Sequence, residues 1–322
     1  MTYNVIVFGG GRIAISHIPH ILSNNDVSSV AVIEPSLVNR LFLKLIFDID
    51  CYSNINKIDI SVFNVACILT PPKYHKFYSD ICAEHSIPFF VEKPVALSFK
   101  DSDSILKKCI SAGIYSQAGY VYRFHPVIKK FVSLISQANE KPKKITLTLN
   151  ANVNNENSND SWRNSDIRGA GCIYDFGSHL FDLSVLLAGD SVSNFKHIST
   201  FKESILGSKC TDKFSSVFEI NGVPNHVACN WANPEVRKAT LFIKVEFGNF
   251  NLETDLFNIL SNKNDLAVVR TNITSLNTNV DYYLRGEDFS RQWEFFFKSI
   301  SLGHKPNINP VVDLMLDAAY EA

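Results

Sequence analysis

Short apolar runs alternate with longer amphipathic stretches over the first 121 residues. The runs predict buried strands, and the stretches between them predict helices. An alternation of this kind is typical of a doubly wound parallel sheet with helices on both faces. The expected strands lie near residues 3–8, 29–33, 64–69, 88–92 and 115–121.

The pattern changes at Lys143, where apolar and polar residues alternate one by one, as in Ile145, Leu147 and Leu149. This period and the short turns predict an open, mostly antiparallel sheet. Its strands are expected at residues 143–153, 192–201, 213–220, 225–232, 239–247 and 250–256, followed by helices over 287–301 and from 309 onward. We therefore predict an α/β domain over residues 1–121 and an α+β domain over 122–322. One face of such a sheet is often covered by a second copy, which predicts that the chain associates with itself.

Small residues follow the first strand at the spacing G-x-G-x-x-A, as Gly9, Gly11 and Ala14. Gly9 would allow a tight turn, Gly11 would let the backbone approach a pyrophosphate, and Ala14 would let helix and strand pack closely. The neighbouring Arg12 and Ile13 begin the helix whose N–H groups would face phosphate. This is the outline of a Rossmann dinucleotide site.

Glu34 ends the second predicted strand, 20 residues beyond Ala14. A carboxylate at this place can accept both ribose hydroxyls of an adenosine and would repel a 2′-phosphate. NAD is therefore favoured over NADP, although Arg40 could reach a phosphate. The alternative interpretation is that Glu34 is a surface acid beside Pro35.

Two further loops follow predicted strands at the carboxyl edge of the sheet, where ligands of open parallel sheets bind. Glu92, Lys93 and Pro94 end one strand, and Lys93 could handle a substrate proton unless it is only a solvated lysine. Thr70 and Pro71 end another strand, where they could contact the cofactor, and His75 follows them as a cofactor contact or simply a polar residue of the next helix.

Asp175, His179 and Asp182 share one face of a predicted helix, because they are four and three residues apart. A histidine titrates near neutral pH and suits proton transfer in alcohol oxidation. The simplest alternative is a solvated helix face. A metal site is a further alternative that we do not favour, because no other histidine or cysteine cluster is evident.

The composition fits a protein of about two domains, with 46% hydrophobic and 20% charged residues among 322. A net charge of −1 argues against nucleic acid or an anionic membrane as a partner, so a small molecule is expected. No apolar run reaches membrane-spanning length, and the first strand leaves no room for a signal peptide. We therefore expect a cytoplasmic protein whose seven dispersed cysteines are reduced core residues.

Five motifs in this order resemble the Gfo/Idh/MocA family of NAD(P)-dependent oxidoreductases: GGGRIAISH, TPP, EKP, GYVYRFHP and GAGCIYDFGSH. The resemblance implies that Lys93 lies by the nicotinamide ribose and that Asp175 and His179 contact substrate, with His179 as general acid/base. It also implies a sugar pocket lined by Arg123 and His125 and by Trp162 and Arg163. The family's second domain often builds assemblies, so the resemblance further implies a homodimer or homotetramer through the C-terminal sheet. Ala170 departs from the family's usual triple glycine.

Hydride transfer between NAD and a secondary alcohol or ketone of a sugar, cyclitol or nucleotide sugar is the function that we expect. Lys93 and His179 would take the hydroxyl proton, and Asp175 would orient the substrate. Two alternatives stay open. One is a non-catalytic sensor of NAD and sugar, and the other is an enzyme that uses tightly held NAD only transiently.

Overall fold

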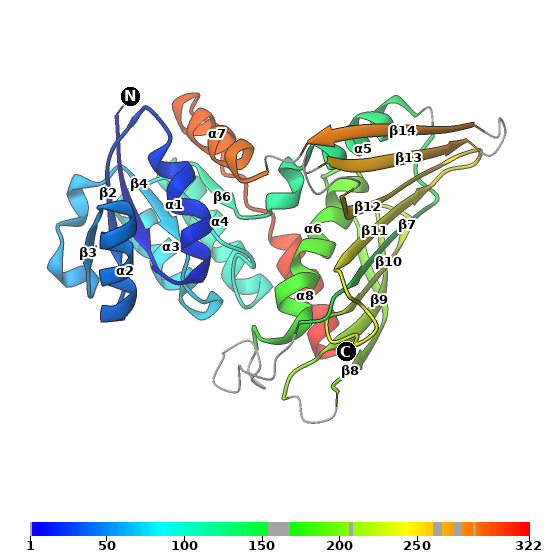
Figure 1. Cartoon of the computed structure of the whole chain (residues 1–322), viewed down its shortest axis with the longest axis horizontal. Coiled ribbons are helices and arrows are strands. Elements are labelled where there is room, and N and C mark those ends of the chain that lie inside the picture. The colour runs from blue at the N-terminus through cyan, green and yellow to red at the C-terminus, as the bar shows by residue number, and fades with distance from the viewer. Residues whose placement is uncertain are drawn as a thin grey trace. The chain divides into compact units, whose positions relative to one another are not determined.

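The computed structural model of the chain describes residues 2–138, 140–153, 168–205, 209–259, 266–273, 278–285 and 288–322. The chain forms two compact units (Figure 1). The first comprises Met1–Val121 and Phe289–Asp313, and the second comprises Tyr122–Asp288 and Leu314–Ala322.

The first unit is built on a six-stranded, wholly parallel sheet in the order β3-β2-β1-β4-β5-β6. Its strands are β1 (Tyr3–Phe8), β2 (Val27–Ile33), β3 (Asp50–Tyr52), β4 (Val65–Ile68), β5 (Phe89–Val91) and β6 (Ser116–Ala118). The predicted doubly wound sheet is confirmed. The sequence pattern missed β3, because a strand of three residues is too short to show a period.

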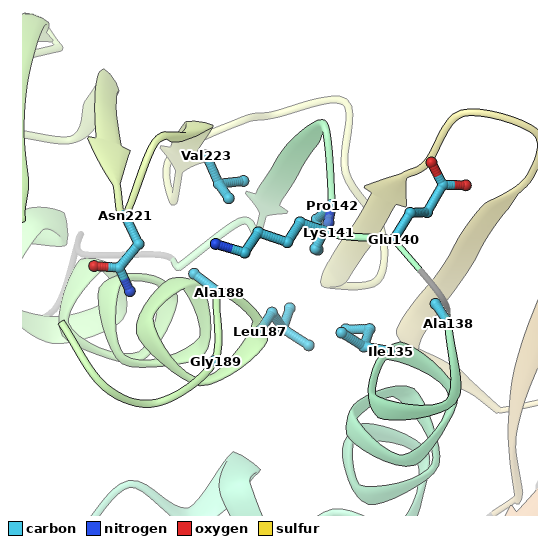
Figure 2. Close-up of a pocket in the computed structure, with 10 residues that line it drawn as sticks. All are labelled: Ile135, Ala138, Glu140, Lys141, Pro142, Leu187, Ala188, Gly189, Asn221 and Val223. Carbon is cyan, nitrogen blue, oxygen red and sulfur yellow. The ribbon is translucent and has the colours of Figure 1, made fainter. Parts of the chain in front are cut away.

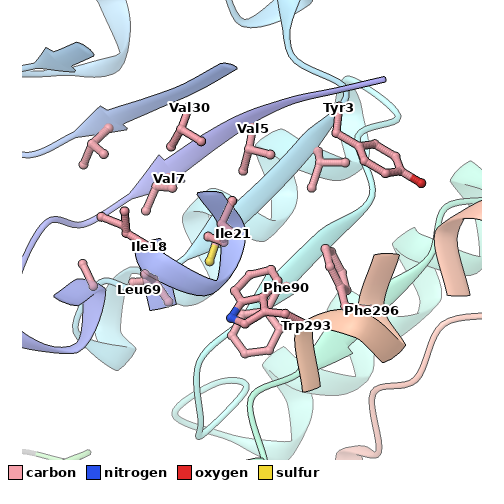
Figure 3. Packing of buried hydrophobic residues seen from close by; sticks show 14 of the residues in the cluster. Tyr3, Val5, Val7, Ile18, Ile21, Val30, Leu69, Phe90, Trp293 and Phe296 are labelled. Atoms are coloured by element: carbon pink, nitrogen blue, oxygen red, sulfur yellow. The ribbon is translucent and has the colours of Figure 1, made fainter. Parts of the chain in front are cut away.

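Helices cover both faces of this sheet. They are α1 (Arg12–Leu22), α2 (Leu37–Phe47), α3 (His75–Glu84) and α4 (Phe99–Ala112). Side chains alternate along β1, so that Val5 and Val7 enter a core with Ala14 and Ile18 of α1 and Leu43 of α2 (Figure 3). The sheet is therefore buried on both sides, as its continuous apolar strands require.

Helix α7 (Asp288–Ser301) packs on this core, although it follows the second unit in sequence. Trp293 is 2% exposed, and its ring lies 4.8 Å from that of Phe90 on β5. Phe296 and Phe297 belong to the same cluster (Figure 3). The assignment of all residues after 121 to the second domain was therefore wrong for 289–313, because the apolar stripe of α7 completes the core of the first unit.

The second unit contains an eight-stranded sheet in the order β14-β13-β12-β11-β7-β10-β9-β8. Its strands are β7 (Lys144–Asn150), β8 (Phe195–Glu203), β9 (Lys213–Ile220), β10 (Val223–Asn230), β11 (Thr240–Glu246), β12 (Asn251–Ile259), β13 (Leu266–Ile273) and β14 (Thr278–Arg285). Only β7 and β10 pair in parallel, so the predicted mostly antiparallel sheet is confirmed. The hairpin of β13 and β14 was not predicted.

One face of this sheet carries the core of the second unit. Ile145, Leu147 and Leu149 of β7 are at most 1% exposed, whereas the intervening Thr146 and Thr148 are half-buried. Helices α5 (Pro126–Gln137) and α6 (Ser178–Leu187) pack against strands of this sheet, and a π-helix, η6 (Ile173–Gly177), leads directly into α6. The last helix is α8 (Pro310–Glu321), capped by Asn309 as predicted.

Candidate cofactor and substrate sites

The turn from β1 to α1 has the geometry of a dinucleotide cradle. Gly9 has φ +97°, and a Cβ on it would lie 2.8 Å from the carbonyl oxygen of Leu69. A Cβ on Gly11 would meet nothing within 4 Å, so the backbone there is open to a ligand. Gly11 begins α1 without a side-chain cap, and Ala14 is fully buried. The local geometry is compatible with the separate roles that the sequence predicts for the three small residues.

Glu34 lies directly beside this turn. Its Oε2 accepts a hydrogen bond from the backbone N–H of Gly10 (2.8 Å), and its Oε1 accepts one from the N–H of Ser36 (2.8 Å). The side chain of Arg40 donates to the carbonyl oxygens of Glu34 and Pro35, both at 2.7 Å. Because Glu34 is only 8% exposed, its interpretation as a surface acid was wrong.

The ends of β4 and β5 are joined through His75. Its Nδ1 lies 2.7 Å from the carbonyl oxygen of Pro94, and its Nε2 lies 2.7 Å from that of Thr70. Burial lowers the pKa of this fully buried histidine, while the two carbonyls act in the opposite direction. His75 therefore ties together the two loops in which Pro71 and Lys93 lie.

Glu92 is held by groups from two helices. Its Oε1 lies 3.0 Å from Nε2 of His17 on α1, and the indole N–H of Trp293 donates to Nδ1 of the same histidine (3.1 Å). Because Nδ1 accepts this bond, neutral His17 carries its proton on Nε2 and donates it to Glu92. The other carboxylate oxygen accepts from the N–H of Lys93 (3.2 Å). His17 and Trp293 fix the position of Glu92, and the sequence analysis gave neither of them this role.

Asp175 and His179 lie in the second unit, on η6 and α6. His179 is 8% exposed, and its ring centroid lies 4.6 Å from that of Tyr122. Burial raises the pKa of Tyr122, and the charges of Asp288 and Asp175 raise it further. The structure thus brings Tyr122 against His179 and within the electrostatic influence of Asp175. The sequence analysis missed Tyr122, although it directly precedes Arg123 in the motif GYVYRFHP.

Asp182, the third residue of the predicted polar face, forms an ion pair with Arg123. The guanidinium Nε lies 2.8 Å from both carboxylate oxygens, and Nη1 lies 2.8 Å from Oδ1 of Asp190. Asp182 is 1% exposed, so this part of the face is not solvated. Burial raises the pKa of Asp182, and Arg123 opposes that rise. Arg123 therefore anchors the start of the second unit to α6.

The remaining predicted residues are dispersed. His125 caps α5 by accepting the N–H of Val127 at Nδ1 (3.2 Å), and Arg12 is exposed at the start of α1, where Ile13 packs partly against the core. Trp162 and Arg163 lie outside the described residues.

A cavity of about 430 Å³ opens in the second unit (Figure 2). Its apolar wall includes Ile135, Leu187 and Val223, and Lys141 reaches across it (Figure 2). It contains none of the predicted site residues. We therefore do not assign the predicted chemistry to it.

Within the described part of the chain, no group of three or more histidine, cysteine or acidic side chains could hold a metal ion. None of the seven cysteines forms a disulfide, and six of them are buried. Among the same residues, no helix is both long enough and apolar enough to cross a membrane.

The glycine turn, the acidic residue after β2 and the loops at the carboxyl edge define a dinucleotide-binding protein with a second, sheet-based unit. The family profile described as "Oxidoreductase family, NAD-binding Rossmann fold" matches residues 3–120, and the "GFO/IDH/MocA C-terminal domain" matches residues 141–250. The chain belongs to the Gfo/Idh/MocA family, and its first unit is an NAD-binding Rossmann domain.

Two relatives match parts of the chain. A 2,7-anhydro-N-acetylneuraminate hydratase of Mediterraneibacter gnavus is 31% identical over 109 residues, which span 33% of this chain and 28% of that protein. A D-xylose 1-dehydrogenase (NADP(+)) of Haloferax volcanii is 21% identical over 258 residues, which span 78% of this chain and 75% of that protein.

Two solved structures share the whole fold. A levoglucosan dehydrogenase in complex with NADH and levoglucosan superimposes with a TM-score of 0.86 at 17% identity, covering 100% of this chain and 97% of that one. A 3-ketoreductase from Actinomadura kijaniata, in complex with NADP and TDP-benzene, gives a TM-score of 0.84 at 12% identity, with coverages of 100% and 98%.

Proposed function

We propose that this protein is an NAD-dependent dehydrogenase or reductase that acts on a CH–OH group of a sugar, cyclitol or nucleotide sugar. The observation that carries the proposal is the Gly9–Gly11 turn with Glu34 beside it, in a Rossmann domain of an oxidoreductase family. The names of the relatives and structural neighbours, which include a xylose and a levoglucosan dehydrogenase, support the substrate class.

The residues of the first unit fit a dinucleotide. The open backbone at Gly11 and the uncapped start of α1 suit a pyrophosphate, with Arg12 and Ile13 at the same turn. The carboxylate of Glu34 suits the adenosine ribose and favours NAD over NADP. Thr70 supports the fit, because its Oγ1 is buried and makes no hydrogen bond within the described part of the chain. Pro71 and Glu92 would complete the contacts.

The bound nicotinamide would supply the hydride acceptor, and the side chains would handle the proton. Oxidation of a secondary alcohol releases one hydride from carbon and one proton from the hydroxyl oxygen. We assign that proton to Lys93 and His179, and in the reverse direction they return it to the carbonyl oxygen. Asp175 would hold a neighbouring hydroxyl or orient His179. Arg123 stabilises the fold through its ion pairs with Asp182 and Asp190. It would contact sugar only through the part of its guanidinium group that these ion pairs do not use.

The test is to incubate the protein and NAD with a panel of sugars and nucleotide sugars, beginning with D-xylose and levoglucosan, and to measure turnover by the absorbance of NADH. Lys93→Ala and His179→Ala should lower kcat by at least about 100-fold, because each removes a proton-transfer group. Lys100→Ala, on the exposed side of α4, and His304→Ala serve as matched controls and should keep wild-type turnover. Full turnover in either site variant, with NAD binding intact, would refute the assigned roles.

A second candidate is an enzyme that uses tightly held NAD without net reduction, and the hydratase name of one relative favours it. Product would then form while the NADH absorbance stays constant. A non-catalytic sensor of NAD and sugar is the remaining alternative, which any turnover would exclude.

We also propose a cytoplasmic homodimer or homotetramer that forms through the outer face of the second unit's sheet, with neither nucleic acid nor a membrane as a partner. This face carries small polar side chains, such as Thr146, Thr148 and Ser215, that permit close approach. Thr146→Arg with Thr148→Arg should reduce the assembly in sedimentation. An unchanged assembly would exclude this face.

A further inference from the structure

Helix α2 exposes a continuous apolar stripe. We refer to six residues of this helix together as the α2 stripe: Leu37, Val38, Leu41, Phe42, Leu45 and Ile46. Their exposed fractions range from 44% at Phe42 to 82% at Leu45. No charged residue belongs to the stripe.

The stripe is not needed for packing α2 on its own sheet. The inward side of the helix already holds Leu43, which is fully buried, and Phe47, which packs partly against the same core. A surface helix normally places polar residues opposite its buried face, whereas α2 is apolar on both. The α2 stripe exposes roughly 700 Å² of apolar surface, more than the 300–600 Å² patch of a typical monomer.

We propose that the α2 stripe binds the same stripe of a second copy of this chain, with the two helices antiparallel across a two-fold axis. The stripe consists of two ridges at i, i+4 spacing, one of leucines (Leu37, Leu41, Leu45) and one of Val38, Phe42 and Ile46. Ridges of this kind are the surface features through which helices pack on one another.

The stripe is self-complementary, which a two-fold interface requires. If the axis passes between Leu41 and Phe42, the leucine ridge of one copy meets the leucine ridge of the other, and the ridge of Val38, Phe42 and Ile46 likewise meets its own copy. Every stripe residue then meets an apolar partner. The stripe can contribute at most roughly 700 Å² on each copy, against the 800 Å² per partner of a standard interface.

The flanking charges do not oppose this arrangement. Lys44 lies outside the two ridges. Arg40 is turned toward its own chain, because it donates to the carbonyl oxygens of Glu34 and Pro35. No charged side chain therefore belongs to the ridges that meet. The interface lies wholly in the first unit and is independent of the sheet of the second unit and of the proposed catalysis.

Sedimentation velocity of the full chain tests the proposal. Leu41→Glu places two carboxylates beside the axis and should shift the assembly to the next smaller species, with the dissociation constant raised at least about 100-fold. Ile110→Glu on α4 is the matched control, because Ile110 is 62% exposed and Leu41 is 60% exposed. This control should sediment like the wild type, and both variants should keep the wild-type circular dichroism spectrum and NAD binding.

Cross-linking tests the register. Leu41→Cys should give a disulfide-linked dimer on mild oxidation, because residue 41 lies next to the axis. Leu37→Cys should not, since its two copies would lie roughly 13 Å apart along the helices, beyond the 7 Å Cα limit of a disulfide. The wild type reports any background from its own cysteines.

Three results would overturn the proposal. They are a wild type that stays monomeric at its highest soluble concentration, a Leu41→Glu variant that assembles like the wild type, and cross-linking that is stronger at residue 37 than at residue 41. Co-sedimentation of the wild type with vesicles of anionic phospholipid is a further arm. If a monomeric wild type binds them and Leu41→Glu does not, the stripe binds lipid and the second copy is excluded.

Discussion

Replacement of Arg123 by methionine tests whether this arginine is an internal anchor of the second unit. In the structure its guanidinium makes two 2.8 Å bonds to Asp182 and one to Asp190. Methionine keeps much of the side-chain volume and removes the charge. Asp182, at 1% exposed, is then left buried without its partner. Breaking a buried pair in this way costs about 3–5 kcal/mol of unfolding free energy.

The loss should depend on pH in a defined direction. Without Arg123, burial and the charge of Asp190 both raise the pKa of the Asp182 carboxyl unopposed, so it rises further above the unfolded value. The native state then binds a proton more tightly than the unfolded chain. The variant therefore loses up to about 1.4 kcal/mol of stability per pH unit as the pH rises from the unfolded toward the native pKa.

The assay is urea unfolding of both proteins at pH 5 and pH 8, followed by circular dichroism. The double variant Arg123→Met with Asp182→Leu removes the buried charge and should recover most of the loss. Asp190→Asn is the second control and should cost less than about 1 kcal/mol, because Asp190 is exposed. A loss below about 1 kcal/mol in Arg123→Met, or no recovery in the double variant, would refute the anchor.

Three other predictions concern the two units. Gly9→Ala should cost at least about 2 kcal/mol and abolish NAD binding in calorimetry, because Cβ would collide with the carbonyl oxygen of Leu69. His125→Asn should keep the hydrogen bond to the N–H of Val127 but remove a source of acid sensitivity. Burial lowers the pKa of His125 to about 4, so the wild type should lose about 2 kcal/mol of unfolding free energy, measured in urea, between pH 7 and pH 5. The variant should not show this loss. Trp293→Ala should cost about 3–5 kcal/mol and speed hydrogen exchange in β1 and α1, whereas faster exchange confined to β7–β11 would contradict the placement of α7.

Local patterns predicted much of the fold and of the cofactor turn. The first 34 residues alone predict the strand before Gly9, the glycine turn and the position of Glu34. This is possible because a strand, a turn and the start of a helix depend mainly on neighbouring residues. The alternation after Lys143 likewise predicted the sheet of the second unit. Its last hairpin, β13 and β14, was missed.

Long-range partners could not be predicted in this way. Arg123 meets Asp182 and Asp190, which follow it by 59 and 67 residues, and single positions in a sequence do not show which charges pair. The apolar stripe of α7 was evident, but the choice between two cores to bury Trp293 depends on how the whole chain folds. For the same reason the contact of Tyr122 with His179 appeared only in the structure.

Transfer of deuterium tests the central claim most directly. A sugar that binds the protein would carry deuterium at each carbon that bears a secondary hydroxyl and would be incubated with NAD and the wild-type protein. The masses of the NADH and of the sugar product would then be measured by mass spectrometry. Direct hydride transfer predicts NADH that carries one deuterium at the nicotinamide ring, with the label lost from one sugar carbon. Unlabelled NADH, product formed without NADH, or no reaction with any sugar that binds would contradict a dehydrogenase that transfers hydride between sugar and free NAD.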